Sequence, residues 1–140
     1  MTTYLLDTNG CIALINGTPK DVRRRFQRAV ARNHVILLSS LVAFELWYGV
    51  AKSQRKESHT RRLEAFFAGP LEWTLFDDED ARAAGTVRAE LEAAGKPIGA
   101  YDVLIAGQAR RRGATLVTSN AGEFGRVAGL KWENWAAPRG

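Results

Sequence analysis

Short apolar runs alternate with longer amphipathic segments along the chain. The apolar runs are rich in β-branched and aliphatic residues and predict buried strands at residues 4–6, 35–38, 73–76, 115–117 and 131–135. The segments between them place apolar residues at helical spacing and predict helices at residues 11–15, 20–32, 41–51, 60–68, 78–94 and 100–112. This alternation predicts an α/β fold in one domain over residues 1–140, with a mostly parallel sheet of four or five strands and helices on both faces.

Two segments depart from this alternation. Lys52–Arg62 is polar and basic and predicts a connection between helices, while residues 120–127 predict a loop or a short helix. Thr18 followed by Pro19 predicts an N-cap and a first helical residue for the helix at 20–32.

Composition narrows the class of protein. The 46% hydrophobic and 25% charged fractions are those of an ordinary globular domain. A single cysteine, Cys11, excludes an intrachain disulfide and a multi-cysteine zinc site.

No signal peptide is recognisable and no apolar run reaches the ~18 residues of a membrane span, so we expect a cytoplasmic protein with no membrane partner. The net charge of +5 favours a polyanionic partner such as nucleic acid.

Three acids stand in apolar surroundings. Asp7 ends the first predicted strand, Glu45 lies inside the apolar segment 41–48, and Asp102 lies inside the apolar segment 98–106. Acids are rarely buried unless they are paired or bind a metal, so these three need a partner. Other acids fall on charged faces of predicted helices, among them Glu79, Asp80, Glu90 and Glu92.

The predicted topology brings these acids to one edge. Function in open α/β sheets collects at the carboxyl ends of the strands, where Asp7 would lie. Glu45 and Asp102 are near the starts of their predicted helices, and Gly99 permits a close backbone approach. A further polar cluster follows the strand at 115–117 and comprises Thr118, Asn120 and Glu123.

Several carboxylates in one small site need a cation, because like charges repel and raise one another's pKa. Oxygen ligands suit Mg²⁺ or Mn²⁺, which also bind phosphate and activate water for attack on a phosphodiester. His34 and His59 lie in polar surroundings typical of the surface and do not compete for this role. Each acid also has a local explanation: helix capping by Asp7 or Thr8, an ion pair with arginine for Glu45, and a favourable helix-start charge for Asp102.

Four motifs in order resemble the PIN-domain family, and more narrowly the VapC-type toxins of bacterial toxin–antitoxin pairs. They are Leu6-Asp7-Thr8-Asn9, residues 45–53, residues 98–106, and residues 116–120 with Glu123-Phe124. The likeness continues through residues 125–130 and spans essentially the whole chain.

The resemblance implies a three-layer PIN-like fold and a Mg²⁺- or Mn²⁺-dependent ribonuclease that cuts RNA, often tRNA or rRNA, and arrests growth. Carried onto matching positions, it makes catalytic metal ligands of Asp7, Glu45 and Asp102, with Glu123 as a further contributor. Polar support would come from Thr8, Thr118 and Asn120. Many members have Asp where this chain has Asn120, and Gly122 and Ala128 replace residues that are more often Arg and Pro.

The resemblance also implies partners. A VapB-type antitoxin would cover the active-site groove with its tail and insert a basic side chain among the acids, and a homodimer is usual in the family. Candidate docking residues for the antitoxin are Leu46, Trp47, Phe66 and Phe67, which core packing explains equally well. The basic runs near Arg23 and Lys52 are candidate RNA contacts.

Three other functions could explain an acid at the end of the first strand or acids within apolar segments. A haloacid-dehalogenase-type phosphatase needs a second Asp two residues after the first, where this chain has Asn9. A receiver domain needs paired acids at the first strand and a late lysine, and no lysine follows closely on Val117. A non-catalytic RNA-binding module with structural acids remains the alternative, and metal dependence separates it from a nuclease.

Overall fold

A computed structural model describes residues 1–136 and contains one five-stranded sheet. The strands are β1 (Thr3–Leu6), β2 (Val35–Ser39), β3 (Glu72–Thr74), β4 (Thr115–Val117) and β5 (Lys131–Glu133). They pair in the order β3-β2-β1-β4-β5, and every pair is parallel. This confirms the predicted α/β class and the parallel sheet, and it places β1 at the centre.

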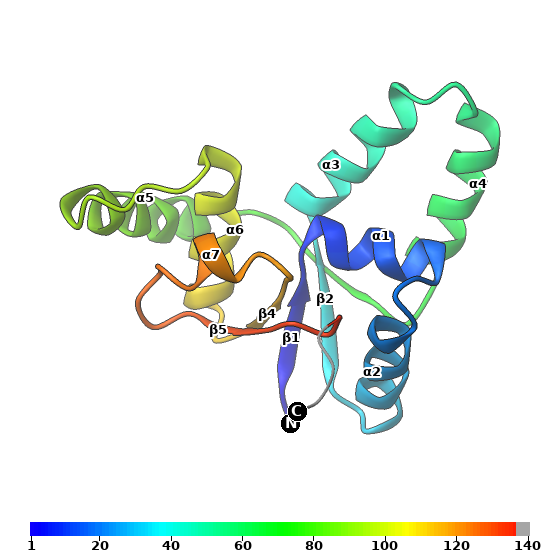
Figure 1. Cartoon of the computed structure of the whole chain (residues 1–140), viewed down its shortest axis with the longest axis horizontal. Coiled ribbons are helices and arrows are strands. Elements are labelled where there is room, and N and C mark those ends of the chain that lie inside the picture. The colour runs from blue at the N-terminus through cyan, green and yellow to red at the C-terminus, as the bar shows by residue number, and fades with distance from the viewer. Residues whose placement is uncertain (137–140) are drawn as a thin grey trace.

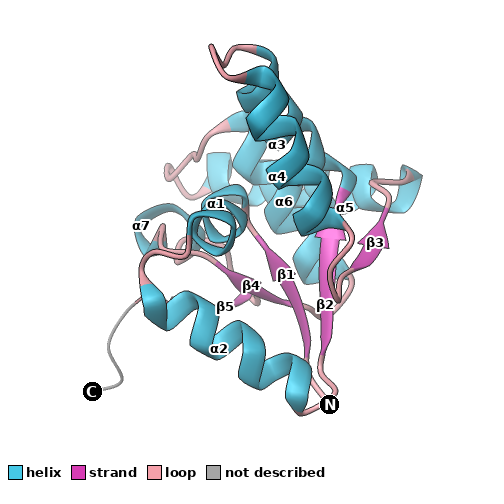
Figure 2. Ribbon diagram, turned by 90° about the vertical axis from the view of Figure 1, so that its right-hand side faces the viewer, coloured by secondary structure: helices cyan, strands magenta, loops and turns pink. Residues whose placement is uncertain are grey.

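Helices cover both faces of the sheet, which gives three layers. The helices are α1 (Thr8–Asn16), α2 (Lys20–Ala31), α3 (Ser40–Ala51), α4 (Lys56–Phe67), α5 (Asp78–Ala93), α6 (Ala100–Arg111) and α7 (Ala121–Phe124). Helices α1 and α2 lie on one side of the sheet and α5 and α6 on the other (Figure 1). Helix α3 leaves the carboxyl end of β2, and α4 returns beside it, so the pair projects beyond that edge (Figures 1 and 2).

The core is built on the two central strands. Leu5 and Leu6 of β1 and Leu116 of β4 are fully buried, as expected for parallel strands that are covered on both faces. The register pairs Leu6 with Val117, so the residues that follow these two strands emerge side by side. The backbone N–H of Asp7 donates to the Val117 carbonyl at 3.1 Å and continues the ladder into the loop region.

Helices α1 and α4 begin earlier than predicted, α1 at Thr8 instead of residue 11, and the N-cap of α2 differs from the prediction. Helix α4 begins at Lys56, within the segment predicted as a connection, because its polar residues form an exposed first turn ahead of the buried Leu63. Helix α2 begins at Lys20 with Pro19 as its N-cap, so Thr18 does not cap it. The shift follows from the extended backbone of Pro19, with φ −68° and ψ 149°.

The prediction that Asp80 lies on a charged face is wrong, because its side chain is fully buried. Asp80 completes a capping box with Asp77 at the start of α5. Its carboxylate also accepts hydrogen bonds from Gln108 Nε2 at 3.0 Å, Arg111 Nη1 at 2.9 Å and Arg112 Nη2 at 2.9 Å. Burial raises the pKa of Asp80, but the two guanidinium groups, the cap and Gln108 outweigh it and lower the pKa to about 2.

Helices α5 and α6 approach closely beside this buried carboxylate. A Cβ atom on Gly107 would lie only 2.5 Å from the Ala84 Cα, so the contact requires glycine at this position. We call the hydrogen bonds from Arg111 and Arg112 to Asp80 the Asp80 clamp. This clamp and the Gly107–Ala84 contact together fix α6 against α5. The position of α6 matters for the site, because its first turn holds Asp102.

Within the described part of the chain, residues 1–136, no helix is long and apolar enough to cross a membrane.

Asp80→Ala tests the clamp. We expect it to lower the free energy of unfolding by about 3 kcal/mol, because it leaves two arginines and a buried amide without their acceptor. The loss stays at the lower end of the range for buried ion pairs because Arg111 and Arg112 are 33% and 27% exposed. Urea denaturation measures the change, and Glu79→Ala, an exposed neighbour on the same helix turn, is the matched control. Equal stability of the two variants would contradict a structural role for Asp80.

Candidate active site

Asp7 caps α1 and also occupies the carboxyl edge of the sheet. Its Oδ1 accepts a hydrogen bond from the Gly10 N–H at 2.7 Å, so the local capping explanation is correct. The side chain is only 8% exposed, and burial raises its pKa against the opposing effect of hydrogen bonds from Thr118 and Gly10. A buried carboxylate held in one orientation by two donors keeps its second oxygen for another ligand.

The loop after β4 brings the predicted polar cluster to Asp7. Thr118 is buried, and its Oγ1 accepts from the Asn120 N–H at 3.0 Å. Asn120 caps α7 by accepting from the Glu123 N–H at 3.3 Å, and its Nδ2 donates to Glu123 Oε2 at 3.2 Å. Asn120 therefore orients Glu123, and the supporting role of Asn120 in catalysis stays a prediction.

Asp102 and Glu123 form a carboxyl–carboxylate pair. Burial is the main cause that raises the pKa of Asp102 to about 7, followed by the hydrogen bond and charge of Glu123 and the charges of Asp7 and Glu45. The pKa of Glu123 is lowered, first by its hydrogen bond with Asp102 and also by Asn120 and the Gly99 N–H. Of these two groups, Asp102 therefore holds a proton more readily than Glu123 does.

Glu45 reaches the site from α3. Its side chain is half-buried, and it contributes to the raised pKa values of Asp102 and Tyr101. Within residues 1–136 no Lys or Arg forms an ion pair with any of the four predicted acids, so the arginine pairing considered for Glu45 is absent there. The charge of Arg126 helps to lower the pKa of Glu123, but Arg126 forms no ion pair with it, so the fold compensates the four acids only weakly.

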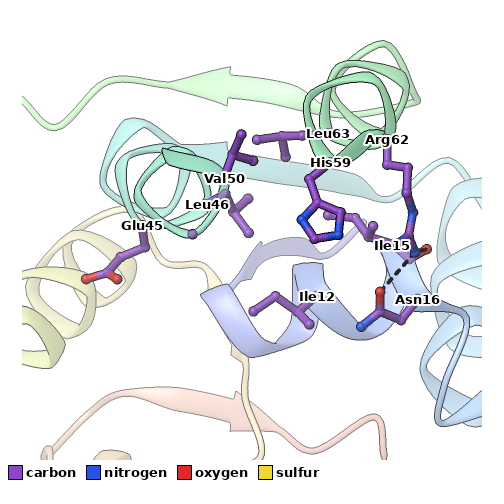
Figure 3. A pocket seen from close by; sticks show the side chains of 10 residues that line it. Ile12, Ile15, Asn16, Glu45, Leu46, Val50, His59, Arg62 and Leu63 are labelled. Carbon is purple, nitrogen blue, oxygen red and sulfur yellow. Dashed lines mark hydrogen bonds between the residues drawn. The ribbon is translucent and has the colours of Figure 1, made fainter. Parts of the chain in front are cut away.

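An apolar groove of about 270 Å³ runs along α1, α3 and α4 and ends at Glu45. Ile12, Leu46 and Leu63 line it, and Figure 3 shows the Glu45 carboxylate at one end, pointing away from them. At the other end Arg62 Nη2 donates to Asn16 Oδ1 at 3.0 Å (Figure 3). The groove therefore carries a negative charge at one end and a positive charge at the other.

Tyr101 is a site residue that the sequence analysis did not identify. Its hydroxyl lies 3.4 Å from Thr8 Oγ1, and burial together with the nearby acids raises its pKa to about 12. Its position directly before Asp102, in the first turn of α6, was the available sequence indication. The neutral hydroxyl holds Thr8 and adds a hydrogen-bond donor in the middle of the acids.

The two histidines stay apart from the acids. Both are half-buried rather than fully exposed. His34 Nδ1 accepts from the Thr2 N–H at 2.9 Å, and His59 Nδ1 lies 2.7 Å from Ser53 Oγ. Their local hydrogen bonds agree with the prediction that neither belongs to the acidic site.

The donor set fits a hard divalent cation. It consists of carboxylate oxygens in a partly buried setting. These carboxylates repel one another and raise the pKa of Asp102, and a bound cation would relieve that repulsion. Within residues 1–136 no three Asp, Glu, His or Cys side chains are grouped as a ready-made metal site. Mg²⁺ suits such an open arrangement, because it usually keeps several waters and takes only one or two protein carboxylates directly.

Comparison with known proteins places this geometry in a family. The model of the PIN domain matches residues 4–130. The tRNA(fMet)-specific endonuclease VapC of Shigella flexneri is 40% identical over 136 residues, which cover 97% of this chain and 100% of that protein. The chain belongs to the PIN-domain family, as the four sequence motifs predicted.

Solved structures agree over nearly the full length. The structure of VapBC2 from Rickettsia felis bound to a DNA fragment from their promoter has a TM-score of 0.88 and 40% identity, and it covers 96% of this chain and 99% of that chain. The structure of DNA-bound VapBC from Salmonella typhimurium has a TM-score of 0.86 and 39% identity, with 96% and 99% coverage. The resemblance to the VapC group is thereby confirmed in sequence and in fold.

The raised pKa of Asp102 predicts a pH dependence of stability for the metal-free protein. The pKa of Asp102 is about 7 in the folded protein, above its usual value of 3.8. The folded state therefore binds a proton more tightly than the unfolded state, and it loses stability as the pH rises through 7. We expect Asp102→Asn to remove this loss and to raise the melting temperature above pH 7. Thermal unfolding across the pH range measures it.

The control for this titration is Glu64→Gln, because Glu64 is an exposed acid on α4. This variant should keep the pH dependence of the parent protein. A parent protein whose melting temperature is flat between pH 5 and 8, or an Asp102→Asn variant that retains the slope, would contradict the raised pKa of Asp102.

Proposed function

We propose that the protein is a divalent-metal-dependent endoribonuclease of the VapC type, with tRNA as its substrate class. The observation that carries this proposal is that Asp7, Glu45 and Glu123, which come from separate elements, all raise the pKa of Asp102. None of these four acids forms an ion pair with Lys or Arg among the described residues. Relatives at about 40% identity are named tRNA(fMet)-specific endonuclease, which supports RNA and favours tRNA.

The residues have distinct roles in this proposal. Asp7, Glu45, Asp102 and Glu123 would hold Mg²⁺ or Mn²⁺. When bound, that ion activates water and stabilises the charge of the phosphodiester under attack. Thr118 and the Gly10 N–H fix the Asp7 carboxylate, and Asn120 fixes Glu123. The Tyr101 hydroxyl lies 3.4 Å from Thr8 Oγ1 and would help to hold Thr8 beside Asp7.

Metal dependence is the first test. Purified protein freed of any partner should cleave a tRNA transcript with Mg²⁺ or Mn²⁺ and should stop when EDTA is added. We expect Asp7→Asn, Glu45→Gln and Asp102→Asn each to reduce the rate by more than the ~10–100-fold that loss of an outer-shell metal partner costs. Gel analysis of end-labelled RNA measures the rates.

The matched control is again Glu64→Gln, which changes one exposed carboxylate outside the site and should leave the rate unchanged. Cleavage that continues in EDTA, or that proceeds at the full rate in Asp7→Asn, would contradict the metal-dependent mechanism. RNA binding without any cleavage under all metal conditions would favour the alternative of a non-catalytic RNA-binding module.

We further propose that the protein is a growth-arresting toxin that a VapB-type antitoxin neutralises. Structures similar to this chain were solved as VapBC complexes, which supports a protein partner of that kind. The apolar groove along α1, α3 and α4 is suited to an amphipathic segment of the antitoxin, since it ends at Glu45, where a basic side chain would meet the acids. Of the docking residues predicted from the sequence, Leu46 lines this groove, while Trp47 and Phe67 pack edge-to-face 5.8 Å apart. The homodimer and the cytoplasmic location stay predictions.

Ile12→Glu tests the groove as the antitoxin site. Ile12 is 41% exposed and lines the groove, so the change should preserve folding and RNA cleavage but place an uncompensated charge against the partner's apolar face. We expect the parent chain to arrest growth when expressed alone and to be neutralised by its co-expressed partner. The Ile12→Glu chain should arrest growth with or without that partner.

Leu75→Glu is the control, since Leu75 is 70% exposed and lies away from the groove. This variant should be neutralised like the parent chain. Full neutralisation of Ile12→Glu would reject the groove, and robust growth of cells expressing an active chain alone would reject the toxin role.

A further inference from the structure

A second hollow, of about 450 Å³, opens between α2 and β5, and we name it the α2–β5 hollow. It lies apart from the groove along α1, α3 and α4: Figures 1 and 2 place α2 at the opposite end of the sheet from α3 and α4. Its lining combines basic and aromatic side chains, and comprises Tyr4, Arg25, Arg28, Ala29, Arg32, His34, Trp132, Glu133, Asn134 and Trp135. Its volume is sufficient for one nucleotide-sized group.

The charge of this hollow is positive. It contains three arginines and one carboxylate, that of Glu133, which accepts from Trp135 Nε1 at 3.0 Å. Arg25 Nη1 donates to the Asn134 carbonyl at 2.8 Å and ties α2 to the segment after β5. Arg28 and Arg32 are exposed, and neither forms an ion pair within the described residues. These two guanidinium groups are therefore available to an anion.

The hollow also has an aromatic wall. Tyr4 packs edge-on against Trp135, with ring centroids 5.1 Å apart, and against His34 at 5.8 Å. The neighbouring Trp132 of β5 remains 37% exposed. Arginines beside an exposed aromatic face are the combination that binds single-stranded nucleic acid, because phosphates pair with the guanidinium groups and bases stack on the ring.

A smaller hollow of about 100 Å³ shares lining residues with both regions. Gly10 and Thr118, which both donate to Asp7, line it. Asn134 and Trp135, which also line the α2–β5 hollow, line it as well. Tyr4 lies on β1 and Asp7 directly follows that strand, three residues later and about 10 Å along an extended chain. The two sites therefore lie within a few nucleotides of one another.

We propose that the α2–β5 hollow binds a single-stranded RNA segment that flanks the cleaved phosphodiester, with phosphates on Arg28 and Arg32 and a base on Trp132. This proposal rests on the proposed ribonuclease function and adds to it a substrate-binding site remote from the acids. Of the three arginines that line this hollow, it selects Arg28 and Arg32, because Arg25 already donates to the Asn134 carbonyl.

Binding of RNA in the absence of cleavage tests this site. Fluorescence anisotropy in EDTA would use a labelled single-stranded RNA of about 12 nucleotides. We expect Arg28→Gln with Arg32→Gln to weaken binding about tenfold and to lower the slope of log Kd against log salt by about 1.4, since each phosphate contact on a single strand contributes about 0.7. Trp132→Leu should weaken binding at least about fivefold and leave the salt slope unchanged.

The matched control is Arg82→Gln with Arg88→Gln, which removes the same charge from exposed positions on α5. If this control and the α2 variant lose equal affinity and equal slope, the effect is one of net charge and the proposal is overturned. If the parent chain cleaves RNA but neither the arginine nor the tryptophan variant differs from the control, the hollow is rejected and the ribonuclease function stands. If the parent chain neither binds nor cleaves RNA, both fail together.

Discussion

The parallel pairing of β1 with β4 is the constraint on which the rest of this structure depends. Parallel strands release their following loops at the same edge, so the register of Leu6 with Val117 sets Asp7 beside Thr118. The ladder bond from Asp7 to Val117 extends that register into the site itself. Asp7 and the Thr118 hydroxyl would not meet if β1 and β4 ran antiparallel, because the residues after the two strands would then lie at opposite edges of the sheet.

Two aspartates, the fully buried Asp80 and the half-buried Asp102, differ in the charges that surround them. Asp80 is surrounded by guanidinium groups and an amide, and its pKa falls to about 2. Asp102 is surrounded by other carboxylates, and its pKa rises to about 7. The Asp80 carboxylate stabilises the fold because arginines compensate its charge. The Asp102 carboxylate is repelled by neighbouring carboxylates, and a bound cation would relieve that repulsion. A residue whose charge the fold leaves uncompensated is a candidate for function.

The sequence was sufficient to predict the fold class, and it singled out three acids that the fold makes electrostatic neighbours. Asp7, Glu45 and Asp102 lie within apolar runs, where an unpartnered acid is costly, so their context alone marked them. Asp80 was misjudged because its partners, Arg111 and Arg112, lie about thirty residues later and on another helix. Tyr101 was missed because a tyrosine in an apolar helix is ordinary until Thr8 is found opposite its hydroxyl. Sequence context thus predicted which acids needed partners, but only tertiary contacts showed which partners were supplied.

The position of Glu45 has a thermodynamic consequence. This one residue lines the end of the apolar groove and also belongs to the acid cluster. A molecule in the groove and a cation at the acids would both contact the same turn of α3, so their binding equilibria would be linked. Linkage is reciprocal: the factor by which an occupant of the groove changes cation affinity equals the factor by which the cation changes affinity for that occupant. The binding of an inhibitor that competes for Glu45 would consequently weaken as the divalent cation concentration rises.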